Sequence, residues 1–180
     1  MLYTGKGDQG YTDLLGGRVP KYAPRPETFG TLDEATSAIG LARAFAQVEE
    51  TKRILVQVQR DLYVMMAELA FAPGVEQDKY HIAQEHVRRL EETIDRLGAT
   101  VPIGRHFVLP GDTVQGAALD FARTVVRRAE RLVARLYHEG EVHNDFLLAY
   151  LNRLSSLLFV LARYEDHRAG VTPTPAKEQP

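Results

Sequence analysis

Apolar residues recur at alternating steps of three and four along most of this 180-residue chain. The clearest run stops just before the Pro73-Gly74 pair and consists of Leu55, Val58, Leu62, Met65 and Leu69. This spacing places apolar side chains on one face of an α-helix. It predicts five helices separated by Gly- and Pro-rich breaks, at residues 26–47, 51–72, 81–97, 112–139 and 144–168. Because such helices bury their apolar faces against one another, the pattern indicates an all-α, five-helix up-down bundle.

Residues at the predicted helix ends fit known capping preferences. Gly98 stands where a left-handed C-cap is favoured. Asp112 with Gln115 can cap the fourth helix, and Asn144 or Asp145 can start the last one.

Composition narrows the class of protein. A length of 180 residues favours one domain, which we expect over residues 1–170, followed by a disordered tail at 171–180. The formal net charge of −2 argues against a nucleic-acid partner. The absence of cysteine excludes disulfides, thiolate metal sites and a cysteine nucleophile. Neither a signal peptide nor a membrane-spanning segment is recognisable, so we expect a cytoplasmic protein that does not bind membranes.

Arginines recur every fourth residue in the fourth predicted helix, at Arg123, Arg127, Arg131 and Arg135. Like charges at this spacing destabilise an isolated helix by roughly 0.2–0.5 kcal/mol a pair, so the row needs acidic partners or an anionic ligand. The first three share one face and could bind a single polyphosphate. The alternative is a solvated face with weak local pairs such as Asp120–Arg123, Arg127–Glu130 and Arg135–Glu139.

The segment 3–21, YTGKGDQGYTDLLGGRVPK, is too glycine-rich for a helix and too polar for a core. Such a loop can offer backbone N–H groups to phosphate, helped by nearby cationic and hydroxyl side chains. It is not a P-loop, because Tyr11 stands where that motif needs lysine and no buried strand precedes it. The alternative is a flexible N-terminal arm.

Two further features allow a functional and a structural interpretation. Asn152 interrupts the apolar run AYLNRLSSLLFVLA, either as a bundle-edge residue or as a hydrogen-bonding partner of a nucleobase or ribose. The adjacent Asp33 and Glu34 point to different faces of a helix, which favours an ion pair with a partner's arginine over acid-base catalysis. The apolar loop residues Phe107, Val108 and Leu109 need something to pack against.

Six motifs in a fixed order resemble the PduO-type ATP:cob(I)alamin adenosyltransferases, or corrinoid adenosyltransferases. They are TGKGDQGYT, RVPK, TLDE, FVLPGD, RTVVRRAER and YLNRLSSLLFVLAR, and the likeness runs from about residue 3 to residue 165. The resemblance implies a ferritin-like bundle that forms a homotrimer with active sites between subunits. It also implies the reaction, in which Co(I) of cob(I)alamin attacks the 5′ carbon of ATP, and adenosylcobalamin and triphosphate are the products.

The resemblance also implies the site residues. A glycine-rich loop that becomes ordered on binding would contact ATP through Thr4, Gly5, Lys6, Gly7, Thr12, Asp13 and Lys21. The last two helices would contribute Arg127, Arg128, Ala129, Glu130, Arg131 and Asn152. Arg127 would also take part in catalysis, Asp33 and Arg123 would pair across the subunit boundary, and Phe107 would displace the lower axial ligand of the corrinoid.

The same resemblance implies a Mg²⁺ ion bridging the phosphates without protein ligands, and as partners a reductase and an adenosylcobalamin-dependent enzyme. Two other hypotheses compete with the adenosyltransferase. One is a nucleotide-sensing module that binds ATP without chemistry, and the other is a purely structural bundle whose arginines pair with a neighbouring subunit.

Overall fold

The computed structural model describes residues 3–75, 78–104 and 106–177, so the end of the predicted tail, 178–180, lies outside it. Within the described residues there are five helices and one β-hairpin. The helices are α1 (Pro24–Phe45), α2 (Glu49–Leu69), α3 (Gln84–Gly98), α4 (Val114–His138) and α5 (Asp145–Arg168). The predicted all-α five-helix bundle is confirmed.

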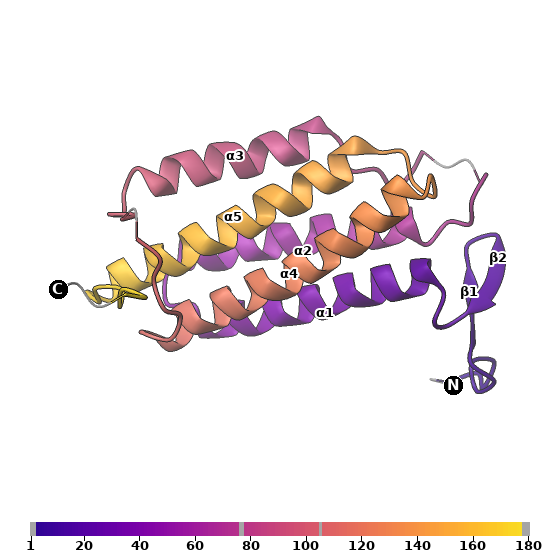
Figure 1. The fold of residues 1–180 in the computed structure, drawn as a ribbon, viewed down its shortest axis with the longest axis horizontal. Coiled ribbons are helices and arrows are strands. Elements are labelled where there is room, and N and C mark those ends of the chain that lie inside the picture. Colours follow the sequence, from indigo (N-terminus) through magenta and orange to yellow (C-terminus); the bar gives the residue numbers. More distant parts are fainter. Residues whose placement is uncertain (1–2, 76–77, 105, 178–180) are drawn as a thin grey trace.

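Each helix runs opposite to the one before it (Figure 1). Helix α1 packs against α2 and α4, while α5 packs against α4 and α3. One end of the bundle therefore carries the hairpin, the described parts of the α2–α3 connection (70–75 and 78–83) and the turn between α4 and α5 (Figure 1). The opposite end carries the described parts of the α3–α4 connection (99–104 and 106–113) and the segment 169–177 (Figure 1).

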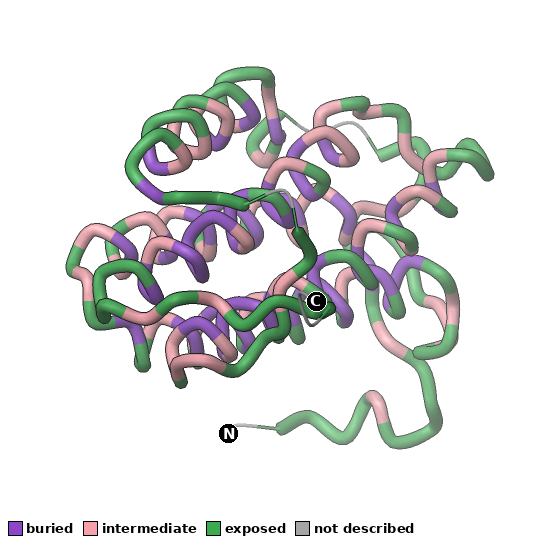
Figure 2. Tube along the Cα trace, turned by 60° about the vertical axis from the view of Figure 1, so that its left-hand side comes forward, coloured by how far each residue is buried: buried purple, intermediate pink, exposed green. Residues whose placement is uncertain are grey.

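The core lies between the helices, where their apolar faces meet (Figure 2). Helix α5 is its centre, with fully buried Tyr150, Leu154, Leu158 and Leu161. By length and composition α5 could cross a membrane, but 56% of its most apolar window is buried inside this bundle. Apolar character of that kind is expected of a helix that is covered by neighbours on several sides.

Helix ends follow local capping chemistry, with two departures from the sequence prediction. Asn144 caps α5 as expected, since its Oδ1 accepts from Phe146 N at 3.0 Å. Helix α4 is capped by Thr113, whose Oγ1 accepts from Gly116 N at 2.9 Å, because Asp112 is engaged elsewhere. Gly98 does not adopt a left-handed conformation, and α3 ends through Ala99 with helical dihedrals.

The sequence predicts a loop for the whole N-terminal segment, but part of that segment forms two strands. Strands β1 (Tyr11–Leu14) and β2 (Gly17–Pro20) form an antiparallel hairpin closed by Leu15 and Gly16. Gly16 has φ 99°, a backbone conformation that is strained for any residue with a side chain. Leu15 exchanges backbone hydrogen bonds of 2.9 Å with Ala70 and Ala72, which docks the hairpin on the end of α2.

The C-terminal segment departs from the predicted disorder at residues 174–176. Leu109 N donates to Thr174 O and Ala176 N donates to Phe107 O, each at 2.8 Å. Asp112 accepts from both the backbone N and the Oγ1 of Thr174, at 2.9 and 2.6 Å. These hydrogen bonds lower the pKa of Asp112 and tie the segment to the loop that carries Phe107.

Candidate active site

The arginine row on α4 is only partly neutralised. Arg123 pairs with Asp120 and Arg135 with Glu139, as the structural alternative predicted, and Arg128 pairs with Glu34 of α1. Glu139 also raises the pKa of Arg135. Arg127 and Arg131 are exposed, and across the described residues neither has a carboxylate partner. Arg131 Nη1 instead donates to the carbonyl of Arg127 at 3.0 Å. Two guanidiniums one turn apart are therefore available to an anion.

Asn152 and Glu130 lie beside these arginines and are hydrogen-bonded to each other across the α4–α5 contact. Asn152 Nδ2 donates to Glu130 Oε1 at 3.0 Å, and Asn152 Oδ1 accepts from Arg153 Nη1 at 2.9 Å. Arg153 is anchored in turn by Glu91 of α3 at 2.9 Å. The pair thus has a fixed orientation at the edge of the arginine face.

Two residues carried over by resemblance lie away from this face. Ala129 is completely buried in the core, so its methyl group cannot contact a ligand bound to the arginine face. Arg128 points to α1, where its ion pair with Glu34 borders a groove of about 430 Å³ that Asp33 also lines. Among the described residues of one chain no ion pair joins Asp33 to Arg123, whose carboxylate partner is Asp120.

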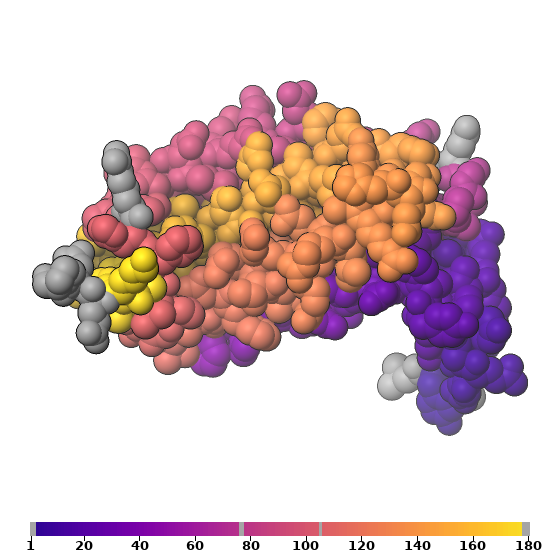
Figure 3. All heavy atoms as spheres, in the orientation of Figure 1, coloured from indigo at the N-terminus to yellow at the C-terminus, as the bar shows by residue number. Residues whose placement is uncertain are grey.

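The glycine-rich residues form an arm that extends from the hairpin end of the bundle, away from its body (Figure 3). Gly5 and Gly10 adopt φ of 68° and 79°, and short turns link Gly5 to Asp8 and Gly7 to Gly10. The predicted phosphate contacts Thr4, Lys6, Thr12 and Lys21 lie in this arm and hairpin.

Side chains in the arm partly constrain one another. Lys21 crosses Gly7 so closely that a Cβ there would come 3.0 Å from Nζ. Arg18 bridges Asp13 at 2.7 Å and the carbonyl of Lys6 at 2.6 Å. Asp13 is thereby engaged, whereas the described residues offer no carboxylate partner to Lys6 or Lys21. The arm thus presents two cations and exposed backbone, and no hydrogen bond or ion pair links it to the arginine face within the part of the chain that the structure describes.

Phe107 lies at the other end of the molecule, with 90% of its surface exposed. It borders a cavity of about 340 Å³ together with Phe159, Arg123 and Asp120. The predicted catalytic residues Phe107 and Arg123 therefore share one cavity. The sequence did not predict that Asp120 lines this cavity. It also gave no sign of Arg163 and Asp166, which form a buried charged cluster with Asp120.

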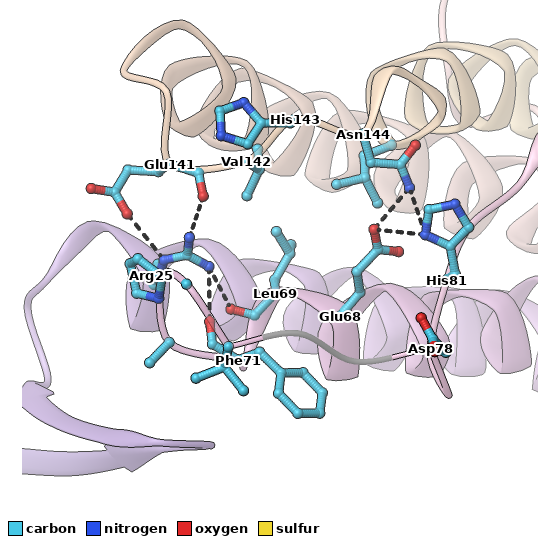
Figure 4. Close-up of a pocket in the computed structure, with 15 residues that line it drawn as sticks. Arg25, Glu68, Leu69, Phe71, Asp78, His81, Glu141, Val142, His143 and Asn144 are labelled. Atoms are coloured by element: carbon cyan, nitrogen blue, oxygen red, sulfur yellow. Dashed lines mark hydrogen bonds and ion pairs between the residues drawn. The ribbon is translucent and has the colours of Figure 1, made fainter.

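A larger cavity of about 690 Å³ lies at the hairpin end and is not part of the predicted site (Figure 4). Arg25 closes one side of it and is itself buried, pairing with Glu141 at 3.2 Å and donating to the carbonyls of Leu69 and Phe71. On the other side Asn144 donates to Glu68 at 2.8 Å. Arg25 thus joins the ends of three helices, which positions the hairpin docked there.

In chemical terms the described residues offer two unpaired guanidiniums, a glycine-rich cationic arm and a cavity lined by Phe107 and Phe159. These features are those of a helical-bundle protein with a surface suited to an anionic ligand. Residues 2–165 match the model of the family described as cobalamin adenosyltransferase. The chain belongs to this family. The match confirms the family resemblance and the transferase activity class that were predicted from the sequence.

Relatives agree with this assignment. The chain is 40% identical over 174 residues to the corrinoid adenosyltransferase of Bacillus subtilis, covering 94% of this chain and 89% of that protein. It is 42% identical over 172 residues to the corrinoid adenosyltransferase PduO of Citrobacter freundii, covering 93% of this chain but half of that longer protein. A variant PduO-type ATP:corrinoid adenosyltransferase from Lactobacillus reuteri, solved with cobalamin and ATP, superposes with a TM-score of 0.90 at 31% identity, over 99% of this chain and 100% of that one.

Proposed function

We propose that this protein transfers the 5′-deoxyadenosyl group of ATP to the cobalt of cob(I)alamin, giving adenosylcobalamin and triphosphate. Family membership and the ligands of the Lactobacillus reuteri relative support the reaction. The observation that carries the proposal is electrostatic. Arg127 and Arg131 are exposed side by side and, within the described residues, no carboxylate neutralises them.

In the proposed reaction the electron pair of Co(I) attacks C5′ of ATP. The Co–C5′ bond forms as the C5′–O bond breaks, and the bonding electrons leave with the triphosphate. No side chain has to act as the nucleophile, so the protein supplies position and charge. Arg127 and Arg131 would stabilise the negative charge that grows on the departing triphosphate, while Glu130 and Asn152 orient the nucleoside.

The proposal includes a Mg²⁺ ion on the phosphates. Phosphate oxygens are ligands that Mg²⁺ accepts readily while it keeps most of its waters. The proposed ion would therefore be held by the nucleotide rather than by side chains.

We further propose that the active site lies between copies in a homotrimer. Among the described residues no hydrogen bond or ion pair joins the arm to the arginine face of the same chain, and this favours an arm from a second copy at each nucleotide site. The α1–α4 groove supports this assembly, since Leu41 and Phe121 are exposed large apolar side chains beside Asp33. Asp33 of one copy could then pair with Arg123 of the next.

Phe107 would act on the corrinoid side of the site. Its exposed ring can occupy the space of the lower axial ligand, beside a cavity that Phe159 also lines. We place the enzyme in the cytoplasm and in cobalamin biosynthesis, where a reductase supplies Co(I) and an adenosylcobalamin-dependent enzyme takes the product.

An anaerobic assay with ATP, Mg²⁺ and chemically reduced cob(I)alamin tests the proposal through the absorbance change of adenosylcobalamin formation. Arg127→Ala removes a charge contact to the leaving triphosphate, and we expect kcat to fall about 10²-fold or more.

Arg135→Ala is the matched control, because Arg135 lies on the same helix but is paired with Glu139. It should retain near-normal turnover. A parent protein without product, or equal activity of parent and Arg127→Ala, would show the assignment to be wrong.

A further inference from the structure

A buried charge cluster lies behind the Phe107 cavity. Asp120, Arg163 and Asp166 have exposed fractions of 5%, 5% and 1%. Arg163 Nη2 lies 3.2 Å from Asp120 Oδ2 and 3.0 Å from Asp166 Oδ2. Asp166 also accepts from Thr113 Oγ1 at 2.6 Å. Two carboxylates thus share one guanidinium, so these three residues carry one excess negative charge.

The excess charge is balanced by Arg123. Its Nε donates to Asp120 Oδ1 at 2.9 Å, which makes the four-residue cluster neutral. Arg163 alone does not balance the two buried carboxylates. In addition, its Nε and Nη1 have no hydrogen-bond partner among the described residues. Burying an uncompensated carboxylate is strongly unfavourable, so Asp120 has a physical reason to hold Arg123.

The ion pair between Asp120 and Arg123 differs from an ordinary surface ion pair between residues three apart on a helix. Such a pair is weak when both partners are solvated and free to rotate. Here the carboxylate is buried and held from behind by Arg163, whose guanidinium lies 5.8 Å from the ring centroid of Phe159 in the cavity wall. Asp120 is therefore a buried anchor for Arg123, whose side chain is partly exposed.

The contact with Asp120 leaves the two terminal nitrogens of Arg123, Nη1 and Nη2, available for another partner. Asp120 takes Nε, and neither terminal nitrogen makes a hydrogen bond to any residue that the structure describes. A guanidinium anchored at Nε presents its terminal pair in one plane, which suits recognition of a second carboxylate. Arg123 lines the same cavity as Phe107, so the terminal pair is displayed at the proposed corrinoid site.

We propose that Asp120 is a positioning residue for adenosyl transfer: fixed by Arg163, it orients Arg123 so that the terminal nitrogens meet Asp33 of a neighbouring copy beside the corrinoid. The inference rests on the proposed function. It assigns Asp120 no contact with either substrate, and its effect passes entirely through Arg123.

Asp120→Asn tests this, because it keeps the shape and removes the anchoring charge. We expect kcat with cob(I)alamin to fall by roughly 10- to 100-fold, the scale of a misplaced active-site group, while KM for ATP stays close to that of the parent. Asp61→Asn is the matched control, since Asp61 is also buried and paired, with Arg89, but lies away from the cavity. It should leave kcat unchanged.

A double-mutant cycle separates positioning from general stability. In an Arg123→Ala background, Asp120→Asn should cause no further loss of kcat. An equal loss in both backgrounds, or normal kcat in Asp120→Asn, overturns the inference. If Asp120→Asn does not fold, Asp120→Glu keeps the charge but displaces it by one methylene, and it should still lower kcat.

A readout independent of turnover distinguishes failure of this inference from failure of the proposed function. The side-chain Nε–H of Arg123, assigned by its absence in Arg123→Lys, should be protected from solvent exchange in the parent and in Asp61→Asn. It should exchange rapidly in Asp120→Asn. An unchanged Nε–H signal refutes the anchoring, whereas a parent protein that makes no adenosylcobalamin refutes the function alone.

Discussion

Gly116 in the first turn of α4 gives a test in which two physical effects predict opposite signs. Replacing a helical glycine by alanine normally stabilises a helix by about 1 kcal/mol. At Gly116, however, a Cβ would lie 2.5 Å from Asp166 Oδ1 and 2.9 Å from Thr113 Oγ1. Neither oxygen can move freely, because Asp166 is buried against Arg163 and Thr113 caps the helix.

The structure indicates which effect is larger. Overpacking a buried site costs about 1–3 kcal/mol. Displacing Thr113 also weakens the N-cap, which contributes about 1 kcal/mol. Against a propensity gain of about 1 kcal/mol, we expect Gly116→Ala to destabilise the protein by about 1–3 kcal/mol. For a domain of this size that corresponds to a melting temperature lower by about 2–12 °C.

Gly30 in α1 is the matched control, since it is exposed and a Cβ added there would have no atom within 4 Å. Gly30→Ala should be neutral or stabilising by up to about 1 kcal/mol. Urea unfolding followed by circular dichroism, at one fixed protein concentration, measures both variants. If Gly116→Ala is as stable as Gly30→Ala, the close packing of α4 on Asp166 is refuted.

Two further predictions concern the segments around the site. Asp112→Asn should speed amide hydrogen exchange at Thr174 and Ala176 at neutral pH, because it removes the charged acceptor of Thr174. The pKa of Asp112 is lowered in the folded protein, so in the parent the contact should persist above the ordinary Asp pKa of about 4 and weaken as pH falls through the lowered value. Unchanged exchange in the variant would contradict this. The second prediction tests the shared site: an Arg127→Ala chain and a chain with both Lys6→Ala and Lys21→Ala should each have strongly reduced activity. Co-assembly of the two chains should restore part of the activity, since some sites then combine an intact arm with an intact arginine face. No recovery in verified mixed trimers would place both groups in the same chain.

The helices could be predicted because their signal is local. Apolar residues at steps of three and four report the buried face of each helix whatever the partner, and all five were found to within a few residues. The hairpin gave no such signal, since its strands are four residues long and are stabilised by docking on α2. The C-terminal segment was misjudged for the same reason, because its order comes from the distant loop 107–112.

Ala129 shows how two kinds of sequence argument should be weighed. The resemblance assigned it to the nucleotide, yet it belongs to the apolar series Ala122, Val126, Ala129, Val133 and Leu136, all of them buried. Its neighbours Arg127 and Arg131 point outward. The spacing of this series and the resemblance thus suggest different surroundings for the Ala129 side chain, and its burial agrees with the spacing.

The charged residues needed information that a linear pattern does not contain. Asp120 and Arg123 could be paired from their spacing, but the same spacing describes a weak solvated pair. What makes Asp120 an anchor is Arg163, 43 residues further along the chain and on another helix. In a buried ion pair, loss of either partner leaves the charge of the other buried and uncompensated, which is strongly unfavourable. A buried pair is therefore held in place more firmly than a pair on the surface. Asp120 lies outside the six motifs that carry the resemblance, whereas Arg163 ends the last of them and Arg123 begins another, so the proposed positioning role emerges only when the three are seen together.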